Sequence, residues 1–354
     1  MSYDLGSALG WITVIGVVAS IFSYALSMIA GVLLVATTAF GGQLHVLIQT
    51  FPFWALMLGF PLQANSLVIV SISLVIFAVC FVKAASSNGG FLQGLRTLST
   101  GAPPRTLPNW LAVMPLLASA ILLIDLLLTY LQGAFGVSTG SLPVMDPTQL
   151  VPLLAFAPIA EEIGFRISII GLVVGILVAV KLGRSIADGM KAPIDHQLVT
   201  FFSAFISPGH AKERAGLPSI RTNGIKGISL VEWIFVFLTS IVFGAYHVIG
   251  GGWGPGKFLT AALSGFALAI VYLAYGAFAD ILLHWFFDLN LTVFYYYNGL
   301  NGFFGTFGDL ATLGALALGV WGIIIGIYWF ARRSSKTPIP LTPYMSAGQN
   351  PLWQ

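Results

Sequence analysis

The sequence has very few charged residues. Of its 354 residues, 15 are Lys or Arg and 12 are Asp or Glu, which is 8% of the chain. A water-soluble domain carries about 25% charged residues, so a soluble fold is excluded. Intrinsic disorder is excluded as well, because 57% of the residues are hydrophobic. The apolar runs are long and unbroken rather than short and alternating, which argues against a membrane β-barrel. We therefore expect an all-α, polytopic helical membrane protein.

Cysteine and N-terminal basic residues are also scarce. Cys80 is the only cysteine, so neither an intrachain disulfide nor a cysteine metal cluster can form. The first basic residue is Lys83, so no positive charge precedes the apolar segment 11–40 as it would in a secretory signal peptide. We interpret the net charge of +3 as basic cytoplasmic loops rather than nucleic-acid binding.

Several segments are long and apolar enough to cross a hydrocarbon core about 30 Å thick as helices of about 20 residues. The candidates are 11–40, 66–84, 109–131, 150–180, 230–249, 257–275, 277–298 and 309–331. The stretch 44–60 is apolar but contains Pro52, which predicts a short or re-entrant segment. We expect about eight transmembrane helices, with the count open by one.

Loop charges predict the orientation in the membrane. Lys and Arg gather in 83–108, in 181–229 and after the last helix, whereas 132–149 has neither. The positive-inside rule therefore places the basic segments in the cytoplasm. The side of the N-terminus depends on whether 44–60 crosses. We expect a multi-pass integral protein of the cell (plasma) membrane.

The only sizeable polar region is 182–229, which is too short for a separate domain of usual size. Its middle, 198–206, is apolar and aromatic, a composition that suits a segment lying along the membrane surface. The region is either a lid or substrate-docking element or a decorated loop, and we favour the decorated loop.

Ionisable groups at membrane depth are costly and therefore mark candidate sites. In the run Ala160-Glu161-Glu162-Ile163-Gly164-Phe165-Arg166, two adjacent carboxylates repel each other within an apolar helix. Glu162 and Arg166 are four residues apart, so Arg166 can neutralise and orient Glu162. Glu161 points about 100° away and lacks that partner, which makes it the better candidate for a base. A structural ion cluster is the alternative.

Two further groups lie on later helices. Phe243 precedes His247 by one helical turn on the same face, which predicts that its ring packs beneath the imidazole. His284 precedes Asp288 by the same spacing. A carboxylate beside a histidine can orient it or join it in binding a metal. Each pair alone is weak, but two glutamates and two histidines from three helices match the ingredients for activating water. Asp125, outside these groups, more simply predicts an interhelical hydrogen bond.

These motifs resemble those of the CPBP family, which comprises the CAAX prenyl proteases of the type II, Ras-converting kind and bacteriocin-processing and immunity-associated (Abi-like) relatives. The family is recognised by EExxxR, FxxxH and HxxxN or HxxxD in this order on successive core helices. Here the motifs span Glu161 to Arg166, Phe243 to His247 and His284 to Asp288. The resemblance covers about 150–298, as a four-helix catalytic core with the loop 182–229 inserted. The flanking regions, 1–149 and 299–354, contribute transmembrane helices and a C-terminal tail.

The resemblance implies a glutamate-dependent intramembrane endopeptidase, whose metal dependence is left open. Glu161 would be the general base, His247 would hold or activate the water, and Arg166 would organise the glutamates. His284 and Asp288 would stabilise the oxyanion or complete a metal site. If the enzyme is metal-dependent, the expected zinc ligands are Glu161, His247, His284 and Asp288.

Two departures from the family pattern bear on this assignment. An ionised Asp288 accepts hydrogen bonds but cannot donate them, so it fits metal binding or orientation of His284 better than an oxyanion hole. The gap that holds 182–229 is longer than expected. In addition, His247 and His284 would lie over ~10 Å apart in depth at 1.5 Å per helical residue, so tilt, a shorter helix start or a break must reconcile them. Gly276 and the run Gly250-Gly251-Gly252 permit irregular backbone in this region. We expect a water-filled cavity there.

The expected partners are a hydrophobic or lipidated peptide, such as a prenylated CAAX-type C-terminus, and membrane lipid, with no nucleic acid. The alternative functions are a non-catalytic membrane adaptor or immunity protein on the same scaffold and, less favoured, an ion-coupled transporter that uses the buried carboxylates.

Overall fold

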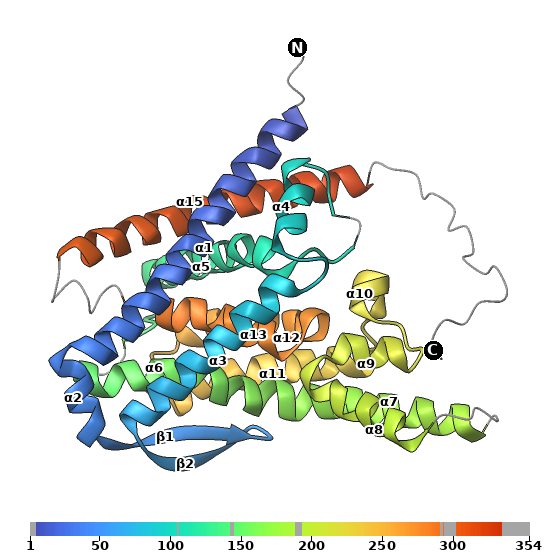
Figure 1. The fold of residues 1–354 in the computed structure, drawn as a ribbon, viewed down its shortest axis with the longest axis horizontal. Helices are drawn as coiled ribbons and strands as arrows, with labels where there is room; N and C mark the ends of the chain where they lie inside the picture. The colour runs from blue at the N-terminus through green and yellow to red at the C-terminus, as the bar shows by residue number, and fades with distance from the viewer. Residues whose placement is uncertain are drawn as a thin grey trace.

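The computed structural model describes residues 5–104, 106–141, 145–187, 193–290, 293 and 302–334. Within these ranges, seven helices are long and apolar enough to cross a membrane. They are α1 (Leu5–Thr37), α3 (Ser66–Ser86), α5 (Trp110–Ala134), the continuous run of α6 (Pro147–Glu162), η1 (Ile163–Ile170) and α7 (Gly171–Ala187), α11 (Leu230–Ile249), α12 (Lys257–Tyr275) and α15 (Gly302–Ser334). Most of them run lengthwise through the molecule (Figure 1). The expected all-α, polytopic membrane fold is confirmed.

The eighth candidate, 277–298, has a different structure where it is described. Helix α12 ends at Gly276, whose φ of 95° is not helical. A residue with a side chain rarely adopts this φ, so the position favours glycine. The short helix α13 (Ala277–Trp285) and the π-helix η3 (Phe286–Asn290) follow, and residues 291, 292 and 294–298 lie outside the described residues. Every residue of α13 except the half-buried Phe278 is buried. This helix is therefore enclosed by its neighbours.

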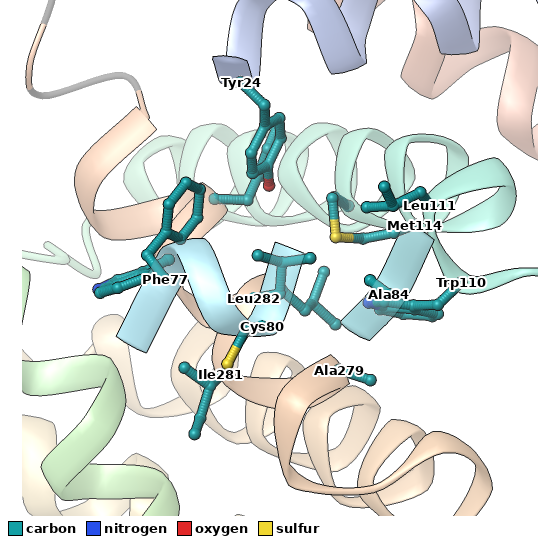
Figure 2. Packing of buried hydrophobic residues seen from close by; sticks show 14 of the residues in the cluster. Tyr24, Phe77, Cys80, Ala84, Trp110, Leu111, Met114, Ala279, Ile281 and Leu282 are labelled. Atoms are coloured by element: carbon teal, nitrogen blue, oxygen red, sulfur yellow. The ribbon is translucent and has the colours of Figure 1, made fainter. Parts of the chain in front are cut away.

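The main hydrophobic core surrounds α13. Figure 2 shows Ala279, Ile281 and Leu282 of this helix beside Phe77 and Cys80 of α3. Cys80 is 5% exposed and belongs to this core.

The segment 44–60 falls on the end of the short helix α2 (Ala39–Val46) and on a β-hairpin. Strands β1 (Ile48–Ala55) and β2 (Leu58–Asn65) pair antiparallel, with Pro52 opposite Pro61. Leu56 and Met57 both have positive φ, as a tight two-residue hairpin turn requires. A hairpin returns to the side from which it starts, so this segment is re-entrant and does not cross.

The hairpin also determines how α1 and α3 relate. Because the chain between them returns to the same side, the two helices cross in opposite directions. The start of α1 consequently meets α4 (Phe91–Ser99), where a Cβ on Gly10 would lie 2.3 Å from the Ser99 carbonyl oxygen. The N-terminal end of α1 is therefore on the side of loop 83–108, which the loop charges predict to be cytoplasmic.

The polar region 182–229 forms several short helices rather than an open loop. They are α8 (Ile194–Ile206), α9 (Pro208–Arg214), α10 (Ile220–Asn223) and the 3₁₀ turn η2 (Gly224–Gly227). The Tyr272 hydroxyl donates to the Phe205 carbonyl oxygen at 2.8 Å, and Lys212 forms a buried ion pair with Glu232 at 2.6 Å. The region is thus attached to the transmembrane helices α11 and α12.

The apolar middle of this region lies on α8. Leu198, Val199, Phe202 and Ile206 are each at least half exposed on that helix. An exposed apolar face suits the predicted position along the membrane surface, and the choice between a lid and a decorated loop stays open.

Candidate active site

The first motif lies where an α-helix changes into a π-helix. Glu161 and Glu162 end α6, and Arg166 lies in η1. Arg166 is fully buried, and its Nη1 donates to Glu162 Oε1 at 3.1 Å, which is the contact that the spacing predicts. π-helical turns widen a helix locally and are frequent at functional sites.

Two further contacts hold the Arg166 guanidinium. Its Nη2 donates to the Gly265 carbonyl oxygen of α12 at 3.2 Å, and its central carbon lies 4.4 Å from the centroid of the Phe243 ring. An arginine placed over an aromatic face gains a cation–π interaction, which is stronger in a desolvated site. Arg166 is therefore fixed from three directions.

His284 connects the first motif with the third. Its Nδ1 lies 2.7 Å from Glu162 Oε1, and because a carboxylate accepts, Nδ1 is the donor. Its Nε2 lies 3.7 Å from Glu161 Oε2 and 3.6 Å from Asp288 Oδ2. The imidazole thus stands between Glu162 on one side and two further carboxylates on the other, an environment that favours its cationic form. Asp288 belongs to η3, the second π-helix of the site.

His247 joins the site through Phe243. Its Nδ1 lies 2.8 Å from the Phe243 carbonyl oxygen, which can only accept, so Nδ1 carries the hydrogen and Nε2 is the acceptor nitrogen of the neutral ring. The Phe243 ring centroid lies 4.6 Å from that of His247 and 5.9 Å from that of His284. Both histidine rings therefore lie against Phe243. The break at Gly276, after which α13 starts afresh inside the bundle, brings His284 to that ring.

The tip of the β-hairpin packs on the first motif, which sequence reasoning missed. Met57 N donates to the Gly164 carbonyl oxygen at 3.1 Å, and Leu56 N donates to Ser168 Oγ at 2.9 Å. A Cβ on Gly164 would lie 2.2 Å from Trp54 Cβ, so only glycine permits this approach. The one sequence signal was a glycine between Glu162 and Arg166, and it does not identify the hairpin.

Asp125 lies outside the site. Its Oδ2 accepts a hydrogen bond from Ser264 Oγ at 2.8 Å, between α5 and α12. The structure thus has the interhelical hydrogen bond that the sequence analysis favours for this residue.

The expected metal site is not assembled in the structure. Across the described residues, no three His, Cys, Asp or Glu side chains come together in a way that could hold a metal ion. Zinc binding by Glu161, His247, His284 and Asp288 therefore stays a prediction, and we derive no step through a metal. The expected water-filled cavity stays a prediction.

Comparison with known proteins agrees with the motifs. Residues 143–290 match the family model "Rce1-like: Type II CAAX prenyl endopeptidase Rce1-like", a range that contains all six candidate site residues. No curated protein and no solved structure was found that matches the chain. This match covers 148 of the 354 residues and supports a CAAX protease (CPBP-type) domain at residues 143–290.

Proposed function

We propose that this protein is an intramembrane endopeptidase that hydrolyses its substrate by a glutamate-activated water, with Glu161 as the general base. One observation supports the choice of Glu161. Glu162 is bound through Oε1 to both Arg166 and His284, at 3.1 Å and 2.7 Å, and two such contacts stabilise its ionised form and make it the weaker base. Glu161 Oε2 is buried without a hydrogen-bond donor in the described part of the chain, and His284 Nε2 lies 3.7 Å away, so Glu161 is the better candidate to accept a proton from water.

The chemistry follows from these roles. Glu161 removes one proton from the water while the oxygen attacks the carbonyl carbon of the scissile peptide. His247, with its hydrogen on Nδ1, presents Nε2 as an acceptor for the water's second hydrogen. The carbonyl oxygen becomes an anion, and the C–N bond then breaks as the proton held by Glu161 passes to the leaving nitrogen.

His284 is suited to stabilise that anion. Contact with Glu162 through Nδ1 and the proximity of Glu161 and Asp288 favour the imidazolium form, whose Nε2–H can donate to an oxyanion. An ionised Asp288 cannot donate, so its role is to orient His284 and stabilise its charge. Arg166 acts only through Glu162.

The proposed substrate is a hydrophobic or lipidated peptide, with a prenylated CAAX-type C-terminus as the first candidate, cleaved within the cell membrane. The family description supports this class. The site's surroundings do too, because Phe165 and Phe243 border it from the first and second motifs and Trp54 and Tyr246 pack beside them. Such a setting favours apolar ligands.

The test is cleavage of a quenched fluorescent CAAX peptide, farnesylated or unmodified, by purified protein in lipid vesicles. We expect Glu161→Gln to lower kcat by about 10²–10⁴-fold, the usual contribution of a general base. Asp125→Asn, which alters a half-buried acid outside the site, serves as the matched control and should retain activity. Full activity of the Glu161 variant would remove it as the base. A cellular phenotype that survives Glu161→Gln would instead favour the adaptor function.

A further inference from the structure

Asp280 is a fully buried acid beside the site that none of the three motifs includes. It lies in α13, one helical turn before His284. Its Oδ1 accepts a hydrogen bond from Ile281 N at 2.9 Å. Its Oδ2 is buried and receives no N–H or hydroxyl donor from the described residues.

The second carboxyl oxygen of Glu162 also lacks a hydrogen-bond donor. Glu162 Oε1 receives two donors, whereas Glu162 Oε2 is buried and meets no N–H or hydroxyl group in the described ranges. Asp280 lies one helical turn before His284 on the same face of α13, and His284 Nδ1 lies 2.7 Å from Glu162 Oε1, which brings the carboxyl group of Asp280 to the side chain of Glu162. Two ionised carboxylates only accept, so this contact requires a proton on one of them.

The surrounding charges decide which one carries it. Glu162 contacts two cationic groups, Arg166 and the imidazole of His284, and both favour its ionised form. No ion pair of Asp280 with a cation occurs among the described residues. Moreover, the site holds four carboxyl groups (those of Glu161, Glu162, Asp280 and Asp288) against at most two cations, and an uncompensated charge in this setting is costly.

We propose that Asp280 is a protonated positioning residue whose carboxyl donates a hydrogen bond to Glu162 Oε2. Both oxygens of Glu162 are then held, Oε1 by Arg166 and His284 and Oε2 by Asp280. Because Glu162 cannot rotate, it holds the His284 ring with Nε2 directed toward Glu161. The importance of this contact for cleavage rests on the function proposed above, but the contact itself does not.

A spectroscopic measurement tests the proton directly. A protonated carboxyl has a C=O stretching band that shifts in D₂O, and infrared spectra of the wild type should contain such a band that disappears in Asp280→Asn. Asp125→Asn is the matched control and should retain that band. Absence of any change between the wild type and Asp280→Asn would overturn the proposal, whether or not the protein cleaves the peptide.

Cleavage by two variants tests the positioning role. In Asp280→Asn the amide N–H₂ can replace the carboxyl as donor, so kcat should stay within about threefold of the wild type, since the hydrogen bond is retained. Asp280→Leu has a similar size but no donor and should lose roughly ten- to a hundredfold in kcat, because the bond is to a charged acceptor. Size-exclusion profiles identify unfolded protein.

The outcomes separate this inference from the proposed function. Equal losses in Asp280→Asn and Asp280→Leu would show that the charge of Asp280, not a donated hydrogen bond, is needed, and would overturn the proposal. Full activity of Asp280→Leu would do the same. If Glu161→Gln remains active while the infrared band behaves as expected, the proposed function fails and the Asp280 contact stands.

Discussion

Replacing Arg166 with leucine tests whether the first motif is a charge-compensated unit. The guanidinium is fully buried and contacts Glu162 Oε1 at 3.1 Å, the Gly265 carbonyl oxygen at 3.2 Å and the face of Phe243 at 4.4 Å. Removing one member of a buried ion pair typically costs about 3–5 kcal/mol, because the remaining charge is uncompensated. His284 still contacts Glu162, so we expect the lower half of that range, about 3 kcal/mol.

The assay is the free energy of unfolding in mixed micelles, followed by tryptophan fluorescence as denaturing detergent is added. Arg166→Lys retains the charge without the planar fork and should fall between the wild type and Arg166→Leu. The double variant Glu162→Gln/Arg166→Leu leaves no buried ion in the pair and should recover part of the loss. A double variant no more stable than Arg166→Leu, or an Arg166→Leu protein as stable as the wild type, would refute the reasoning.

Three further outcomes are expected. Gly164→Ala should cost about 1–3 kcal/mol and reduce cleavage, because the new Cβ would lie 2.2 Å from Trp54 Cβ, whereas Gly183→Ala, with open space around it, should change neither stability nor cleavage. Lys212→Met should leave Glu232 buried and unpaired, and hydrogen exchange should then show faster exchange in 193–229; protection equal to that of the wild type would contradict this. Treatment with a zinc chelator should leave cleavage unchanged, because the proposed mechanism activates the water with Glu161 and without a metal, and a loss restored by added zinc would show that reasoning to be wrong.

The sequence was sufficient for contacts within one helix. The spacing of four between Glu162 and Arg166 predicts their ion pair, and the spacing between Phe243 and His247 predicts their ring contact, because both follow from helical periodicity. The contact of His284 with Glu162 joins residues 122 positions apart. Only the order of the motifs suggested it, since nothing in the periodicity of one helix determines which face of another it meets.

Two features of the site depended on backbone geometry that the apolar pattern does not encode. Both carboxyl-bearing motifs run into π-helices, at Ile163–Ile170 and Phe286–Asn290, where i→i+5 bonding changes the angles that an α-helix would give. The second feature is the β-hairpin at Ile48–Asn65. Its strands hold their few polar residues near one end, Gln49 and Thr50 in β1 and Gln63 and Asn65 in β2, so they lack the regular alternation that predicts a half-buried strand.

Phe243 explains why an aromatic residue one turn before a histidine belongs to this site. Its ring contacts Arg166, His247 and His284, and these three residues come from the three separate motifs. A ring face attracts the guanidinium, while the bulk of the ring excludes water from the Arg166–Glu162 pair, which strengthens their interaction. An aliphatic side chain would supply the bulk but no attraction for the cation. In the proposed mechanism, the phenylalanine is therefore part of the electrostatic arrangement that keeps Glu162 ionised and leaves Glu161 as the base.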